Sequence, residues 1–218
     1  MKYVPLMTTA TADTRFWDKT ARSYAKSPIE DPEGYERTLA RVGALLSPQD
    51  RVLELGCGTG STALRLAPLA GSWLATDLSP EMITIAREKL LASPTPGLRF
   101  EAATASTAEE AEGGYDVVVG FNYLHLVEDL PATLAHIRSR LRPGGLFVSK
   151  TACITELNPL IRMAIPLMRL VGKAPATVGV FGEAELVKAI VSAGFAVEAV
   201  ERHGAKGKDL RAVVVARG

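Results

Sequence analysis

A glycine-rich turn after a short apolar run constrains this chain more than any other feature. Residues 52–55 are mostly apolar and indicate a buried strand, and the sequence Gly-Cys-Gly-Thr-Gly follows at residues 56–60. Glycines at alternate positions let the backbone turn sharply against a bound molecule. Seventeen residues later, Asp77 ends a second apolar run. In a parallel sheet this carboxylate would lie beside the glycine turn, where it can accept hydrogen bonds from both hydroxyls of a ribose.

The glycine spacing separates two classes of nucleotide-like ligand. A dinucleotide site needs glycines at relative positions one, three and six, but Ser61 occupies position six and the third glycine, Gly60, is at position five. Glu54 stands two residues before the first glycine, where its charge would repel a phosphate and attract a cation. These features favour S-adenosylmethionine, which has no phosphate and carries a sulfonium and an ammonium group.

The segment from Glu54 to Gly60 resembles the first motif of the class I S-adenosylmethionine-dependent methyltransferases. Asp77 and the residues after it are similar to the second motif of that family, and residues 115–126 to its fourth-strand motif. An aspartate usual in the family after the third strand is replaced here by Thr104. The pattern Phe-Trp-Asp at residues 16–18, followed by Tyr24, resembles the amino-terminal arm of many small-molecule methyltransferases.

This resemblance implies S-adenosyl-L-methionine as the cofactor and assigns roles to individual residues. The residues that it implies for cofactor binding are Tyr24, Glu54, Gly56, Cys57, Gly58, Thr59, Gly60, Asp77, Leu78, Met82, Thr104, Ala105, Phe121 and Asn122. His125 would lie near the methyl acceptor and is the candidate general base, although a lone histidine is more often structural. Methyl transfer from a sulfonium depends mainly on alignment and exclusion of water, so a strong base is not required.

Strands and helices alternate from residue 51 to residue 150, which is typical of a doubly wound parallel sheet. Strands are predicted at 52–55, 73–76, 98–102, 115–121 and 146–149, the last after a tight turn at 142–145. Two further predicted strands, 195–201 and 210–216, are too close in sequence for a helical crossover and should be antiparallel. The resemblance implies the same α/β fold, a mostly parallel seven-stranded sheet in the order 3-2-1-4-5-7-6 with a C-terminal antiparallel hairpin.

The chain is expected to divide into an N-terminal arm and helix (1–46), with the helix at 35–46, and a methyltransferase domain (47–218). Residues 1–12 are predicted to be a leader without regular structure. An apolar insert at about 153–180 carries Arg162 and Arg169 on one helical face and a kink at Pro166. We expect this insert to form a lid over the acceptor; a core helix or a dimer-forming helix is the alternative.

The charge balance and the cysteine content of the chain limit the kinds of partner that it can have. Its formal net charge is +1, from 25 basic and 24 acidic residues, so no field of one sign would attract a polyanion. A small-molecule acceptor is therefore expected rather than a nucleic acid. The two cysteines, Cys57 and Cys153, do not have zinc-site spacing, so no metal is expected. The sequence contains no apolar run long enough to span a membrane, so a cytoplasmic protein without stable membrane insertion is expected.

Three functions remain open from the sequence. The first is an S-adenosylmethionine-dependent methyltransferase that acts on a small, partly apolar molecule, with a homodimer possible. The second is an S-adenosylmethionine-binding protein without transferase activity, which Thr104 supports because it replaces the usual acid. The third is a dinucleotide-dependent oxidoreductase.

Overall fold

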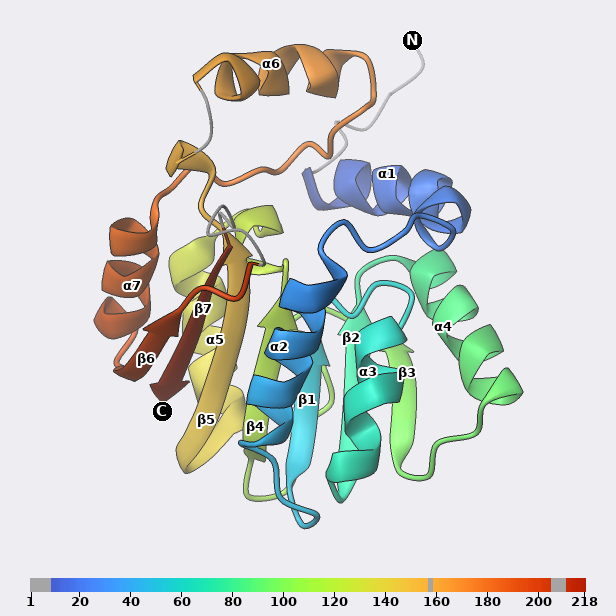
Figure 1. The fold of residues 1–218 in the computed structure, drawn as a ribbon, viewed down its shortest axis with the longest axis vertical. Coiled ribbons are helices and arrows are strands. Elements are labelled where there is room, and N and C mark those ends of the chain that lie inside the picture. Colours follow the sequence, from blue (N-terminus) through green and yellow to red (C-terminus); the bar gives the residue numbers. More distant parts are fainter. Residues whose placement is uncertain (1–8, 157–158, 205–210) are drawn as a thin grey trace, which may run out of the picture.

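A computed structural model describes residues 9–156, 159–204 and 211–218 of the chain (Figure 1). One seven-stranded sheet has the order β3-β2-β1-β4-β5-β7-β6. Strands β1 to β5 pair in parallel, whereas β7 is antiparallel to both β5 and β6. The predicted fold class and strand order are therefore confirmed. The strands are β1 (Arg51–Leu55), β2 (Ser72–Asp77), β3 (Leu98–Ala102), β4 (Tyr115–Phe121), β5 (Leu141–Ala152), β6 (Ala196–Glu201) and β7 (Arg211–Arg217).

Helices cover both faces of the sheet and its upper edge. The α-helices are α1 (Thr9–Tyr24), α2 (Pro32–Gly43), α3 (Ser61–Leu66), α4 (Pro80–Ala92), α5 (Leu130–Arg140), α6 (Pro159–Leu170) and α7 (Glu183–Ser192). Short 3-10 turns are η1 (Ala67–Leu69), η2 (Leu124–Leu126) and η3 (Ile154–Glu156). Helix α4 begins where the side chain of Ser79 accepts a hydrogen bond from the Met82 amide, with Pro80 at its first position.

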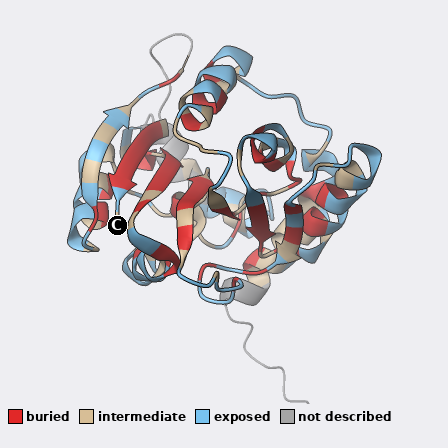
Figure 2. Ribbon diagram, turned by 90° about the horizontal axis from the view of Figure 1, so that it is seen from below, coloured by how far each residue is buried: buried red, intermediate tan, exposed pale blue. Residues whose placement is uncertain are grey.

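Two apolar layers hold these helices on the sheet. Alternate residues of each strand face opposite sides, so Leu53 and Val52 belong to different layers. One layer packs against α5 and α7, and the other against α2, α3 and α4. Figure 2 shows the central strands buried and the outer surfaces of the helices exposed. Helices α1 and α6 do not flank the sheet but lie above the carboxyl ends of its parallel strands (Figure 1).

Three local predictions differ from the structure. Helix α1 begins at Thr9, so the predicted leader of residues 1–12 is too long; its first eight residues lie outside the described part. Helix α2 runs from Pro32 to Gly43 rather than from 35 to 46, because Asp31 caps its amino end by accepting from the Gly34 amide at 3.0 Å. The residues predicted as a turn at 142–145 lie within β5 as an irregularity in its pairing with β4, which passes from Leu141 to Leu146, and the backbone there bonds to Gly218.

Candidate functional site

The glycine turn joins β1 to α3 at the upper edge of the sheet. Gly56, Gly58 and Gly60 all have positive φ, at +69°, +53° and +76°. A Cβ at Gly60 would lie 2.6 Å from Cζ of Phe100, and one at Gly56 would lie 2.7 Å from Cδ2 of Tyr123. By contrast, the nearest atom to a Cβ at Gly58 would be Cε1 of Tyr24, at 3.8 Å. Two of the glycines thus permit close packing, and Gly58 leaves its backbone open to a ligand.

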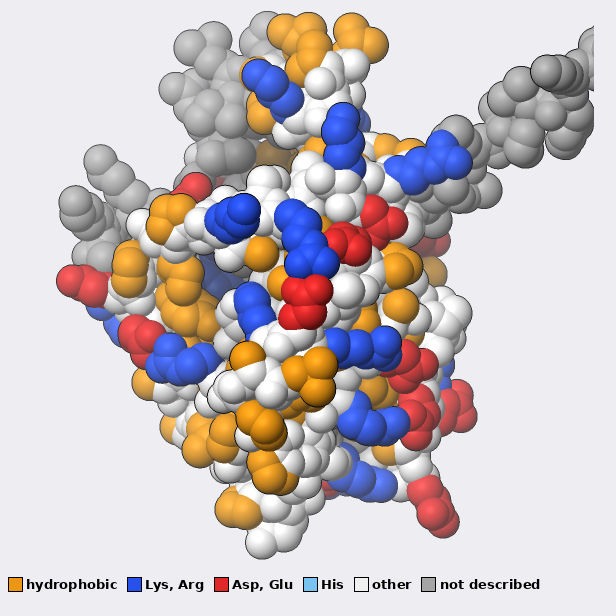
Figure 3. All heavy atoms as spheres, turned by 90° about the vertical axis from the view of Figure 1, so that its right-hand side faces the viewer, with side chains coloured by type: hydrophobic (Ala, Val, Ile, Leu, Met, Phe, Trp, Pro, Cys, Tyr) orange, Lys and Arg blue, Asp and Glu red, His pale blue; other side chains and the backbone are white. Residues whose placement is uncertain are grey.

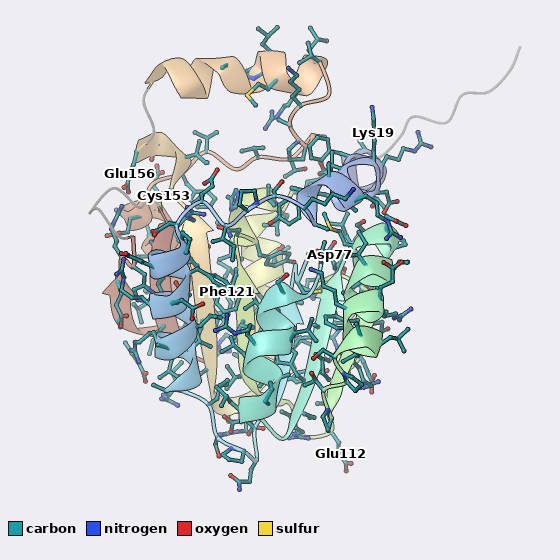
Figure 4. The ribbon with its side chains drawn as sticks, turned by 45° about the vertical axis from the view of Figure 1, so that its right-hand side comes forward. Lys19, Asp77, Glu112, Phe121, Cys153 and Glu156 are labelled. Atoms are coloured by element: carbon teal, nitrogen blue, oxygen red, sulfur yellow. The ribbon has the colours of Figure 1, made fainter. Side chains whose placement is uncertain are left out.

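Asp77 lies at the end of β2, immediately beside this turn. Its two carboxylate oxygens accept from the amides of Gly58 and Ser79, each at 2.9 Å. Burial raises the pKa of Asp77, although these donors oppose the shift. A carboxylate has about four acceptor positions, so lone pairs remain for the two hydroxyls of a ribose. Figure 4 places Asp77 and Phe121 near the upper ends of β2 and β4, the strands on either side of β1, below α1 and α6.

Glu54 is buried beneath the turn, with 2% of its surface exposed. The indole Nε1 of Trp73 donates to its Oε2 at 3.0 Å. Burial raises the pKa of Glu54 to about 7, which the Trp73 hydrogen bond opposes and the charge of Asp77 reinforces. A cation above the turn would favour the ionised carboxylate, whereas a phosphate would oppose it. The site is therefore matched to a cationic nucleoside.

Two other predicted residues of the turn are held by neighbouring elements. Cys57 is buried, and its amide donates to the carbonyl of Thr76 at 2.9 Å. Burial raises the pKa of its thiol well above the ordinary value. The hydroxyl of Thr59 accepts from Nζ of Lys89, on α4, at 2.9 Å. The backbone of Cys57 and Thr59 thus lies at the site, while their side chains are buried against neighbouring elements.

The residues predicted to surround an adenine come from β2, α4 and the segment after β3. Leu78 is half-buried at the end of β2, and Met82 is buried with Ala21 of α1. Thr104 is exposed, and its hydroxyl lies 2.9 Å from that of Ser106. Adjacent Ala105 is buried, and its backbone forms a hydrogen bond with the hydroxyl of Tyr123. Their roles in cofactor binding stay predictions.

The end of β4 supplies the residues predicted to lie near the methyl group. Phe121 is half-buried, and Asn122 has φ +54° while its amide donates to the carbonyl of Lys150 at 2.6 Å. Asn tolerates this left-handed conformation better than most residues. The bend directs the chain from β4 into η2, which contains His125.

Helices α1 and α6 and the strap, by which we mean residues 171–182, form a roof above the upper ends of the strands (Figure 1), and His125 contacts the strap. The carbonyl of His125 accepts from the strap amide of Gly179 at 2.7 Å, and the strap amide of Thr177 donates to Asp13 of α1 at 3.1 Å. Nδ1 of His125 is buried and makes no hydrogen bond to any described residue. Burial, together with the positive charge of Arg211, lowers the pKa of His125 to about 4. The imidazole is therefore neutral near pH 7 and can accept a proton.

Sequence reasoning missed several polar residues that the fold brings close to this edge. Lys150 is buried and donates to the hydroxyl of Thr38 on α2 at 3.0 Å, which also contacts Nδ1 of His203 at 3.1 Å. Arg211, at the start of β7, affects both His125 and Tyr24 electrostatically. None belongs to a local motif, and only the predicted antiparallel direction of the last strand could have indicated that Arg211 reaches the site.

Candidate metal ligands do not cluster in the described part of the chain, where no group of three or more His, Cys, Asp or Glu side chains could hold an ion. Cys153, the second cysteine, is buried at the end of β5. The described residues near these strand ends include carboxylates, a neutral imidazole and cationic side chains.

Comparisons with known proteins agree with this geometry. Residues 53–147 match a family model described as a methyltransferase domain. The highly reducing polyketide synthase lcsB of Purpureocillium lilacinum is 30% identical over 131 residues, which cover 53% of this chain and 5% of the synthase. This chain therefore corresponds to a small part of that relative.

Solved structures share the whole fold. An S-adenosylmethionine-dependent methyltransferase from Mesorhizobium loti has a TM-score of 0.68 at 22% identity, covering 86% of this chain and 99% of that one. The cyclase SpnF has a TM-score of 0.74 at 17% identity, covering 99% of this chain and 98% of that one. Residues 53–147 therefore resemble a methyltransferase domain, and the predicted fold of the class I S-adenosylmethionine-dependent methyltransferases is confirmed.

Proposed function

We propose that this protein transfers a methyl group from S-adenosylmethionine to a small, partly apolar molecule. The observation that carries the proposal is the pairing of Asp77 with the open glycine turn at Gly58, above the buried carboxylate of Glu54. This arrangement offers acceptors to a ribose and negative charge to a cation. The same negative charge disfavours a pyrophosphate, which is why a dinucleotide-dependent oxidoreductase is the weaker alternative.

The residues present fit the cofactor in each of its parts. Asp77 would hold the ribose hydroxyls, and the backbone at Gly58 would lie against the nucleoside. Glu54 would favour the cationic end through charge. Tyr24 is half exposed near Gly58 and would close over the bound molecule. Thr104 would offer a hydroxyl in place of the missing acid near the adenine.

An apolar acceptor fits the roof. Apolar side chains are exposed on α6 and on the strap, namely Leu167, Met168, Leu170, Val171 and Val180. The predicted lid and the polyketide synthase relative both favour a carbon-rich small molecule. On the face seen in Figure 3, basic and acidic side chains are intermixed rather than gathered into a basic patch, which gives a polyanion little to bind. The side chain of Arg162 lies outside the described residues.

Alignment supplies most of the catalysis in this proposal. When bound, S-adenosylmethionine supplies a methyl group that is already activated by its sulfonium. The chain orients the acceptor below the roof and excludes water, and fixed geometry of this kind can contribute about 7 to 11 kcal/mol. Neutral His125 would take a proton from the acceptor, a contribution of about a hundredfold to ten-thousandfold in rate.

The strongest competing function is a cofactor-binding protein with another activity or none. The structural likeness to the cyclase SpnF shows that this fold is not restricted to one chemistry. Thr104, in the place of the usual acid, is the residue that favours this alternative. Cofactor binding without product formation across phenol, quinol and amine acceptors would support it over methyl transfer.

The experiment is calorimetry with S-adenosylhomocysteine and NAD on matched variants. Asp77→Asn should weaken binding of S-adenosylhomocysteine by about 10 to 100-fold, because a hydrogen bond to a charged group contributes about 1.5 to 3 kcal/mol. Asp116→Asn is the control. Asp116 also accepts a hydrogen bond from a backbone amide, that of Arg51 at 2.8 Å, but it lies at the opposite end of the strands, near the start of β4. Unchanged affinity in Asp77→Asn, or tighter binding of NAD by the wild type, would refute the proposal.

Location and oligomeric state rest on fewer observations. Among the described residues, no helix is long and apolar enough to cross a bilayer. The cytoplasmic location and the homodimer both stay predictions. Sedimentation equilibrium would test the dimer, which an apolar face on α6 would stabilise in place of the lid.

A further inference from the structure

Arg211 lies where an acceptor would meet the upper edge of the sheet. It begins β7 and pairs with Ala152, the last residue of β5. Because β7 is antiparallel, its first residue lies at the edge where the parallel strands end. Val213 and Val215, which share its face of β7, pack in the layer next to α2. Arg211 is therefore on the same side of the sheet as the glycine turn's helix α3.

The surroundings of Arg211 join the two halves of the site. Burial raises the pKa of Tyr24, beside the cofactor turn, and the positive charge of Arg211 opposes this rise; at His125, below the roof, burial lowers the pKa and the same charge adds to the effect. Its guanidinium side chain is 32% exposed, and Nη2 lies 3.9 Å from Oε2 of Glu30, whose side chain is 88% exposed. An ion pair this exposed contributes little, so a ligand oxygen can compete with Glu30 for the guanidinium.

The sheet also sets the span from Arg211 to the predicted methyl position. Strand β5 alone separates β4, which ends at Phe121, from β7. Two strand spacings amount to about 10 Å. A molecule that reacts at the end of β4 and reaches Arg211 is therefore about the size of one or two rings. Lys150 lies lower on the same face, opposite Val213, and its Nζ is bound to Thr38.

We propose that Arg211 is a specificity-determining residue that binds the oxygen on which negative charge develops in the acceptor. The inference rests on the proposed function. It names the acceptor class as small molecules with an acidic hydroxyl or enol whose oxygen is the nucleophile or is conjugated to it. Arg suits this role because its planar guanidinium forms charge-assisted hydrogen bonds to oxyanions.

The reaction balances with these groups. The acceptor gives one proton to the imidazole of His125, and the freed electron pair forms the bond to the methyl carbon. The pair of the broken carbon–sulfur bond stays on sulfur, which leaves S-adenosylhomocysteine, and the imidazolium returns its proton to water. Since His125 is a weak base, the acceptor must be acidic, and a cation within about 4 to 6 Å lowers an acid's pKa by about 1 to 3 units.

The test uses para-nitrophenol, whose absorbance reports its ionisation, added to protein saturated with S-adenosylhomocysteine. In the wild type, the pKa of the bound phenol should lie about 1 to 3 units below that in Arg211→Gln. Arg211→Lys should keep part of the pKa shift, because lysine keeps the positive charge but lacks the planar guanidinium with its parallel N–H donors. Arg217→Gln is the matched control on the same strand. Arg217 lies at the other end of β7, away from the site, and its Nε is 2.6 Å from Oε1 of Glu198.

Each outcome is decisive. An equal phenol pKa in wild type and Arg211→Gln, or no binding of the phenol to the saturated wild type, overturns the inference. Failure of the wild type to bind S-adenosylhomocysteine overturns the proposed function instead. Unchanged affinity for S-adenosylhomocysteine in all three variants shows that the fold is intact. With a phenol that is a substrate, Arg211→Gln should raise KM and shift the pH profile of kcat/KM to higher pH.

Discussion

Replacing Glu54 with Gln should stabilise the protein without ligand at alkaline pH. The folded state raises the pKa of this carboxyl from 4.5 to about 7, so it holds a proton that the unfolded chain has released. The contribution of Glu54 to the free energy of unfolding is therefore complete below about pH 4.5 and is lost as the pH rises to about 7. A shift of about 2.5 units corresponds to about 3 kcal/mol of lost stability above pH 7.

Gln has the same shape and cannot ionise, and its amide oxygen can still accept from Nε1 of Trp73. Urea unfolding of Glu54→Gln and wild type should therefore give similar free energies at pH 5 and a difference approaching about 3 kcal/mol at pH 8.5, in favour of the variant. Glu112→Gln is the control, because Glu112 is exposed at the opposite end of the sheet (Figure 4). A difference that does not change with pH would refute the reasoning.

The remaining predictions concern the ligand, the base and the turn. Binding of S-adenosylmethionine at pH 7 should release protons from Glu54, because the sulfonium charge favours the ionised carboxylate. Calorimetry in buffers of different ionisation enthalpy measures this release. Equal release with S-adenosylhomocysteine would contradict a role for the sulfonium charge. His125→Asn should lower kcat by about a hundredfold or more, whereas the control His136→Asn, at an exposed histidine, should leave kcat unchanged. The pH profile of wild-type kcat/KM should show no inflection from an imidazole between pH 5.5 and 8. An inflection near pH 6.5 would contradict the buried, neutral imidazole. Gly60→Ala should lower the free energy of unfolding by about 2 to 5 kcal/mol, because φ is +76° and Cζ of Phe100 would be 2.6 Å from the new Cβ. Gly144→Ala, where φ is +73° but the new Cβ would meet no atom within 4 Å, should lower it by about 1 to 2 kcal/mol. Thermal or urea unfolding measures both. Equal losses in the two glycine variants would show that the turn is not tightly packed.

Local patterns were sufficient to predict most of the fold. Alternating apolar runs and helix signals located every strand, and the short connection before β7 predicted its antiparallel direction, because loop length limits strand direction. Boundaries failed where distant residues decide them. The segment 142–145 resembles a turn, but its pairing with the chain's last residue, Gly218, places it in β5.

The site shows the same division. The glycine turn and Asp77 were predictable, because one sharp turn and one strand end fix their relation in any parallel sheet. The hydrogen bond from Trp73 to Glu54 depends on strand register, and the approach of Arg211 to His125 depends on the position of β7 in the sheet. Residues far apart in sequence carry no local signal for such contacts. The acceptor side of a site is therefore harder to predict than the cofactor side.

The most direct test of the central claim is to observe the amides that surround Asp77. In nitrogen-resolved NMR spectra, the resonances of Gly58 and Ser79, which donate to Asp77, should shift when S-adenosylhomocysteine is added. NAD at the same concentration should leave them in place. If S-adenosylhomocysteine moves neither resonance, or if NAD moves both, the cleft beside the glycine turn does not bind the cofactor proposed here.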